Sequence, residues 1–289
     1  GNAEVVSLLL KSGANFECVF RDGYTPLYIA AQNGKVEVVK KLLAAGALVD
    51  ATCSHGSTPL YIAAQQGKSA VVQVLLSHGA FVDAAFKTGF TPLYVAARNG
   101  HSRVVRLLLS HGAELESHDG DGSTPLYVAS QNGHPEAVKL LLKARANVEA
   151  TFMDGYTPLY IASQNGHPAV VRLLCKHDAV VDRVCGNGSS SLYVAAQNGF
   201  YEVTQYLLQY GASVDATFGT GFTPLYIAAQ RGNLEICRLL LQYRADPDCN
   251  TLRGASALIV ACQKKQVEIA KLLVAAGAST AVSGDNGYT

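Results

Sequence analysis

Histidine and carboxylate side chains, which can bind metals or transfer protons, recur in this chain at fixed intervals. His101, His134 and His167 each follow an Asn-Gly pair and are evenly spaced. An acidic set has the same spacing: Glu17, Asp50, Asp83, Glu116, Glu149, Asp182, Asp215 and Asp248. An interval of about 33 residues indicates stacked repeats, in which equivalent positions lie about 10 Å apart. Such side chains are too widely separated to share one zinc ion or to form a general acid–base pair.

Sequence motifs of catalysis are also missing. The chain contains no phosphate-binding G-x-x-x-x-G-K-[ST], no zinc-protease H-E-x-x-H and no nucleophile motif G-x-S-x-G. We therefore expect no enzyme activity in this segment, no metal and no cofactor.

Composition excludes several classes of partner. Lys and Arg number 23 against 22 Asp and Glu, so the chain has no basic surface for nucleic acid. No apolar run approaches the roughly 18 residues that span a bilayer, which argues against direct membrane insertion. The seven cysteines include no C-x-x-C pair, which favours a reducing compartment and a cytoplasmic, intracellular protein. Cys175 and Cys262 fall at apolar helical positions and are expected in the core.

The repeats themselves are defined by the tetrapeptide Thr-Pro-Leu-Tyr, which recurs without insertions. We predict a single array over residues 1–289, with a partial repeat at 1–24, a further repeat beginning at residue 289, and full repeats starting at residues 25, 58, 91, 124, 157, 190, 223 and 256. Because both ends fall inside repeats, we expect the segment to belong to a longer array.

Each repeat should form two short helices and a projecting loop. In residues 25–57, Thr25 is a suitable N-cap and Pro26 a suitable first helical residue, and the first helix should end at Asn33-Gly34. Apolar residues at helical spacing predict a second helix over about 36–45, ended by Gly46. Short extended runs around His55-Gly56 predict a hairpin-like finger. Arg145, Asp178 and Arg244 replace the terminal glycine, so we expect strained left-handed residues there and a weak point at 178–191.

This unit resembles the ankyrin repeat in its G-x-T-P-L, A-A, G-H, V-V, L-L-L and G-A motifs, which recur in register along the chain. The resemblance implies an all-α solenoid of helix–loop–helix units with projecting β-hairpin fingers, whose fingers and first helices line a concave binding face. It implies a non-catalytic scaffold that binds a protein or peptide partner. The alternatives are a spacer or elastic arm of a larger channel, cytoskeletal or membrane-linked protein, and the substrate-recruiting arm of an enzyme encoded outside this segment.

Tyrosine forms a ladder where the family usually has histidine: Tyr28, Tyr61, Tyr94, Tyr127, Tyr160, Tyr193 and Tyr226, with Ile259 at the eighth position. Each ring could be buried between repeats, which we favour, or could contact a ligand. The acidic ladder falls where the family commonly has asparagine. We expect these carboxylates to bond the backbone of their own finger, and attraction of a cationic partner is the alternative.

A row of amides ends each first helix, at positions that the resemblance places on the binding face. Its predicted partner-binding residues are Gln32, Asn33, Gln65, Gln66, Arg98, Asn99, Gln131, Asn132, Gln164, Asn165, Gln197, Asn198, Gln230 and Arg231, and Gln263-Lys264 extends the row. The row is nearly uniform. Recent duplication would explain this, and so would a repetitive ligand that meets every repeat in the same way.

The fingers repeat with twice the period of the helices. Two aromatic residues flank the turn of every second finger: Phe20 and Tyr24, Phe86 and Phe90, Phe152 and Tyr156, Phe218 and Phe222. The intervening fingers have Ser57, Ser123, Ser189 or Ala255 in place of the second ring. The rings could stiffen their finger or cover the smaller neighbouring one, or they could be partner-binding anchors about 20 Å apart.

Overall fold

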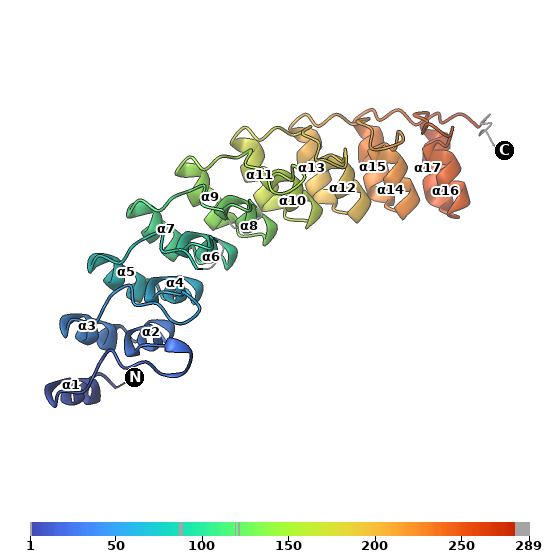
Figure 1. Ribbon diagram of the computed structural model, residues 1–289. Coiled ribbons are helices and arrows are strands. Elements are labelled where there is room, and N and C mark those ends of the chain that lie inside the picture. Colours follow the sequence, from blue (N-terminus) through green and yellow to red (C-terminus); the bar gives the residue numbers. More distant parts are fainter. Residues whose placement is uncertain (1, 87–88, 119, 121, 281–289) are drawn as a thin grey trace. The chain divides into compact units, whose positions relative to one another are not determined.

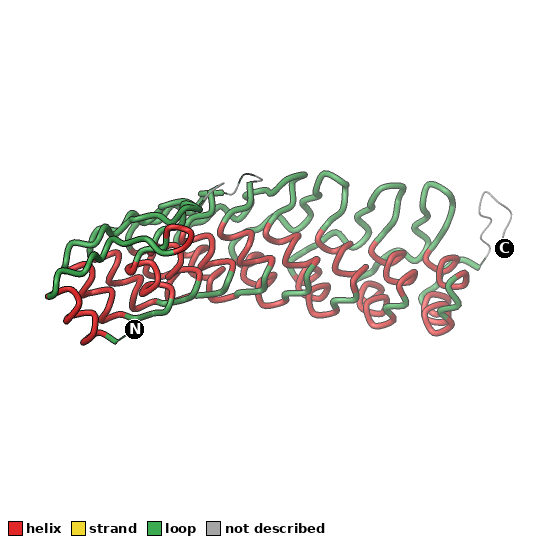
Figure 2. The backbone as a smooth tube through the Cα atoms, turned by 60° about the horizontal axis from the view of Figure 1, so that its bottom comes forward, coloured by secondary structure: helices red, strands yellow, loops and turns green. Residues whose placement is uncertain are grey.

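The computed structural model describes residues 2–86, 89–118, 120 and 122–280, so the repeat predicted to begin at Thr289 lies outside the described residues. The chain divides into two compact units, Gly1–Asn147 and Val148–Thr289. The described parts of both units are built from α-helices joined by loops, as Figures 1 and 2 show. This architecture confirms the predicted all-α solenoid of paired helices.

The first unit, as far as the structure describes it, contains four helix pairs and one additional N-terminal helix. Its first helices are α2 (Pro26–Gln32), α4 (Pro59–Gln65), α6 (Pro92–Arg98) and α8 (Pro125–Gln131). Its second helices are α1 (Ala3–Lys11), α3 (Val36–Ala44), α5 (Ser69–Ser77), α7 (Ser102–Ser110) and α9 (Pro135–Lys143). Consecutive first helices contact one another and so do consecutive second helices, which gives two parallel layers.

The second unit has the same construction, with four helix pairs among its described residues. Its first helices are α10 (Pro158–Gln164), α12 (Ser191–Asn198), α14 (Pro224–Arg231) and α16 (Ala257–Gln263). Its second helices are α11 (Pro168–Lys176), α13 (Tyr201–Gln209), α15 (Leu234–Gln242) and α17 (Val267–Ala275). Neighbouring pairs again stack first helix on first helix and second helix on second helix.

The start of each first helix is fixed by its capping residue. The Thr25 hydroxyl accepts a hydrogen bond from the Tyr28 amide at 3.2 Å, and Pro26 occupies the first turn, where no amide donor is needed. Ser190 and Ser256 replace threonine and cap their helices in the same way. The predicted helix boundaries therefore agree with the structure to within one residue at α2 and α3.

The predicted left-handed residues are also present. Arg145, Asp178 and Arg244 have φ values of 71°, 64° and 65°, where most other repeats have glycine. Side chains in this conformation cost about 1 kcal/mol each, so these three turns are strained relative to their neighbours.

The core is a repeated ladder of leucines from both helices. Leu60, Leu75 and Leu93 are completely buried, and the equivalent residues of other repeats are nearly so. Helices as short as these are not stable alone in water. Burial of this ladder between neighbouring pairs therefore stabilises the helices.

The fingers are hairpin-like turns closed by single bridges rather than regular strands. In the described residues these bridges join Phe20 to Tyr24, Phe86 to Phe90, Phe152 to Tyr156, Val184 to Ser190 and Phe218 to Phe222. A short 3-10 turn, η1 (Arg21–Gly23), lies inside the first of them. Figure 2 shows the loops projecting from the helices in each unit. Four of the five bridges join the aromatic positions that flank the finger turns.

Candidate interaction face

The tyrosine ladder is buried between repeats. All seven rings are 3–8% exposed, and burial raises the pKa of Tyr61 and Tyr160 to about 12. The pKa values of Tyr28, Tyr193 and Tyr226 are also raised, with burial as the main cause. This burial supports the interpretation of the ladder as inter-repeat packing.

The finger aromatics cover this ladder in an alternating pattern. Where an aromatic finger precedes the helix, its second ring packs on the tyrosine of that helix: Tyr24 lies 4.8 Å from Tyr28 and Phe222 lies 5.0 Å from Tyr226 between ring centroids. Where a small finger precedes the helix, the first ring of the next finger covers the tyrosine instead, as Phe218 does for Tyr193 at 4.7 Å. The doubled period of the fingers therefore has a packing explanation.

The small fingers contribute a polar contact to the same arrangement. The hydroxyls of Tyr28 and Tyr94 lie 3.5 Å from Ser57 and Ser123, which stand in place of the second ring. Backbone hydrogen bonds also join an aromatic finger to the small finger that follows it, as in Ser54 N–H to the Asp22 carbonyl at 2.9 Å and Leu252 N–H to the Thr220 carbonyl at 2.8 Å. Two neighbouring fingers thus form one structural pair.

The prediction for the acidic ladder is wrong in one respect. Each carboxylate accepts a hydrogen bond from a backbone amide beyond the second helix of the next repeat, rather than from its own finger. The acceptor and donor pairs are Glu17–Leu48, Asp50–Phe81, Asp83–Glu114, Glu116–Asn147, Glu149–Val180, Asp182–Ser213, Asp215–Asp246 and Asp248–Ser279.

Stacking explains the difference, because it places the loop after the next second helix beside the carboxylate. Aspartate and glutamate both reach that loop, at 2.7 Å for Glu116 and 3.1 Å for Asp83. Partial burial raises the pKa of Asp83 and Asp215, although the backbone bond acts in the opposite direction. The carboxylates therefore link repeats, an arrangement that leaves them less available to a cationic partner.

The polar row that ends each first helix lies at the surface, and we call it the donor row: Gln32, Asn33, Gln65, Gln66, Arg98, Asn99, Gln131, Asn132, Gln164, Asn165, Gln197, Asn198, Gln230, Arg231, Gln263 and Lys264. All of these residues are exposed or half-buried. Within the described residues, the side chains of Gln65, Gln164 and Gln197 make no hydrogen bond. Their amides therefore face solvent.

The asparagines of the donor row have a second role that sequence did not indicate. Asn99 donates to the backbone carbonyl of Gln65 at 3.1 Å, and Asn198 donates to that of Gln164 at 3.0 Å, each in the preceding repeat. Asn33 and Asn132 donate instead to a carbonyl of their own helix. These asparagines stabilise helix ends, so the glutamines are the better candidates for partner contact.

The turn histidines are structural as well. His101 Nε2 donates to the Gln65 carbonyl and His134 Nε2 to the Arg98 carbonyl, both at 3.0 Å. In the part of the chain that the structure describes, no three His, Cys, Asp or Glu side chains gather at metal-binding distance.

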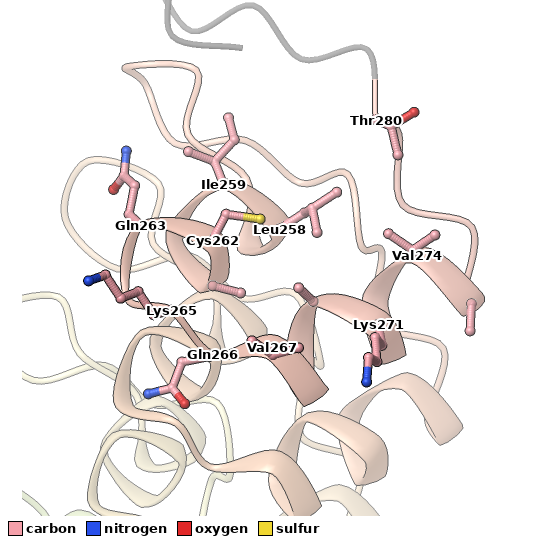
Figure 3. A pocket seen from close by; sticks show the side chains of 13 residues that line it. Leu258, Ile259, Cys262, Gln263, Lys265, Gln266, Val267, Lys271, Val274 and Thr280 are labelled. Atoms are coloured by element: carbon pink, nitrogen blue, oxygen red, sulfur yellow. The ribbon is translucent and has the colours of Figure 1, made fainter.

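An apolar hollow of about 970 Å³ lies against α16 and α17. Figure 3 shows Ile259, Cys262 and Val274 among its lining residues. Cys262 is exposed, so its predicted core position is wrong, whereas Cys175 is buried as predicted. Residues equivalent to Cys262, such as Ala196 and Ala229, are completely buried. The difference arises because no described helix pair stacks on α16 and α17.

A family model described as "Ankyrin repeats (3 copies)" matches residues 1–86, 81–152, 145–218 and 215–283. The chain therefore belongs to the ankyrin repeat family, whose repeats generally mediate protein interactions. Among solved structures, the crystal structure of the human ASB11 ankyrin repeat domain is similar, with 28% sequence identity and a TM-score of 0.70. The match covers 78% of this chain and 100% of that one. No curated protein matches. Among the described residues, no helix is long and apolar enough to cross a membrane.

Proposed function

We propose that this chain is a non-catalytic scaffold that binds a protein or peptide partner through the donor row and the finger aromatics. The donor row is the observation that supports this most strongly. It presents a hydrogen-bond donor at the same place on successive first helices. Within the described residues, the side-chain amides of Gln65, Gln164 and Gln197 have no hydrogen-bond partner. These glutamines, unlike the asparagines of the row, are therefore available to a partner.

The first residue of each donor-row pair belongs to the helix face that carries the ladder tyrosine. Gln32 is four residues beyond Tyr28, so the two side chains project from one helix face. Tyr24 packs on Tyr28 from the finger and is itself half-buried. A partner that contacts the glutamine therefore has an aromatic surface within reach in every second repeat.

Quantitative capture from a cell lysate tests the proposal. We would compare the unaltered chain with a row variant, Gln65→Ala, Gln164→Ala and Gln197→Ala, and with a matched control on the second helices, Gln73→Ala, Gln209→Ala and Gln242→Ala. We expect a saturable set of proteins to be lost in the row variant and retained in the control. Equal capture by both variants, each with an unchanged unfolding transition, would refute the proposed face.

A structural spacer is the second candidate, because a spacer needs no diversified face and the donor row is nearly uniform. In that case the row variant would change neither capture nor stability. A substrate-recruiting arm is a special case of the first proposal, in which a captured protein is modified by a domain encoded outside this segment.

A further inference from the structure

The substitutions within the donor row all retain hydrogen-bond donors. Where glutamine or asparagine is replaced, the residue is Arg98, Arg231 or Lys264, and no member of the row is acidic. Arg and Lys can only donate, whereas amides can donate and accept. Donation is therefore the property common to every position of the row, and it suits a ligand with unpaired acceptors at a regular interval.

The interval between repeats limits the conformation of that ligand. Consecutive first helices contact each other and pack about 10 Å apart. A polyproline II helix advances about 3.1 Å per residue with three residues per turn, so equivalent carbonyls recur about every 9.3 Å, and none of them is used internally.

Other regular conformations fit less well. Seven residues of an α-helix also span about 10.5 Å, but their carbonyls are bonded within the helix. Three residues of a β-strand span about 10 Å, but successive triplets present opposite faces. Only the polyproline II conformation repeats both the distance and the free acceptors.

The finger aromatics add a second feature that suits a proline-rich ligand. Tyr24, Phe90, Tyr156 and Phe222 are half-buried against ladder residues or their neighbours and recur every second repeat. This spacing of about 20 Å corresponds to about six polyproline II residues. Proline rings dock against aromatic side chains in known modes of polyproline recognition.

We propose that, within each unit, the donor row and finger aromatics bind a proline-rich peptide segment in the polyproline II conformation. The row glutamines donate to every third carbonyl, and proline rings pack on the exposed sides of the finger rings. This inference rests on the proposed function and specifies the class of its partner.

The test is direct titration of the full chain with fluorescent oligoproline peptides whose lengths increase from two to five turns of the polyproline II helix. Each added turn gains one donor contact, so the dissociation constant should fall about threefold to tenfold per turn. A Gly-Ser peptide of equal length has carbonyls but no preformed helix and should bind more weakly, and an alanine-based helical peptide should not bind.

Variants connect the binding to the donor row. Gln164→Ala and Gln197→Ala should each weaken oligoproline binding about threefold to tenfold, while Gln209→Ala and Gln242→Ala should leave it unchanged. NMR titration of the unaltered chain provides a readout that does not depend on whether the variants fold. The side-chain amide resonances of Gln164 and Gln197 should shift as oligoproline is added.

The inference is wrong if oligoproline does not bind at about 1 mM, if affinity does not depend on length, or if both sets of variants behave alike. A chain that captures proteins in a row-dependent manner and ignores oligoproline would refute this inference alone. The proposed function would then stand with a different ligand conformation.

Discussion

The ring of Tyr61 packs against the ring of Phe86, which belongs to the following finger, with centroids 5.1 Å apart. The finger that precedes Tyr61 is a small one, so it has no ring to cover this tyrosine. Phe86 supplies that cover from the other side. The contact shows why aromatic residues are needed in only every second finger.

Removal of Phe86 should therefore destabilise the array. We expect Phe86→Ala to lower the free energy of unfolding by about 1–2 kcal/mol, because an aromatic contact and part of the Tyr61 burial are lost. Phe20 occupies the equivalent finger position but is 70% exposed and covers no ladder tyrosine among the described residues, so Phe20→Ala is the matched control. Denaturant unfolding of both variants measures the difference. Equal losses would contradict the packing role.

The carboxylate ladder predicts a localised effect on hydrogen exchange. Asp50 accepts from the Phe81 amide at 3.1 Å. Asp50→Ala removes that acceptor and should cost about 1 kcal/mol and accelerate exchange of the Phe81 amide. Asp50→Asn keeps an oxygen acceptor and should preserve most of the protection. Unchanged exchange at Phe81 in the alanine variant would show that the bond contributes nothing.

The buried tyrosines predict alkaline destabilisation. The pKa of Tyr61 is raised to about 12 in the folded chain, whereas an unfolded tyrosine ionises near pH 10. The unfolded state therefore loses its proton first, and stability that is complete below about pH 10 declines as the pH rises from about 10 to 12. Denaturant midpoints over this range, together with phenolate absorbance, measure the effect. In Tyr61→Phe the decline should be smaller, and an identical decline would exclude Tyr61 as a cause.

Two glycines of similar backbone conformation should respond differently to substitution. Gly100 and Gly112 have φ values of 70° and 80°, but a Cβ on Gly100 would lie 2.5 Å from the His134 ring, whereas nothing lies within 4 Å of one on Gly112. Gly112→Ala should cost about 1 kcal/mol from backbone strain, and Gly100→Ala should cost more. Adding His134→Ala to Gly100→Ala should recover part of the loss. Equal thermal shifts for the two single variants would contradict the role of the ring.

Much of the fold could be predicted from the sequence, because residues next to each helix determine where the helix begins and ends. Thr25 and Pro26 fix the start of a helix, and a glycine such as Gly46 fixes the end of most second helices, so the repeated caps and stops predict where the helices lie. The partners of the acidic ladder could not be obtained in this way. The hydrogen bond from the Phe81 amide to the Asp50 carboxylate depends on how one repeat packs on the next, and local sequence does not specify that packing.

The candidate face was only partly predictable for the same reason. The resemblance to the ankyrin repeat predicted that the donor row would lie at the surface, and its residues are exposed or half-buried. Glutamines of the row face solvent, whereas asparagines such as Asn99 bond the preceding repeat. This division depends on how the repeats stack, which local sequence does not specify. Cys262 illustrates the same limit for burial. Its apolar helical position predicted a place in the core, but the side chain is exposed because no described helix pair follows it.

Alternating cover of the tyrosines also constrains how the gene can change in length. Loss of residues 58–90 would join Ser57 to Thr91 and delete Phe90, whose ring lies 5.0 Å from that of Tyr94. A small finger would then both precede and follow Tyr94, and its ring would have no aromatic cover. Loss of two consecutive repeats preserves the alternation. Recombination that removes or adds an even number of repeats therefore keeps every ladder tyrosine next to one aromatic finger, while an odd number breaks the alternation at the junction.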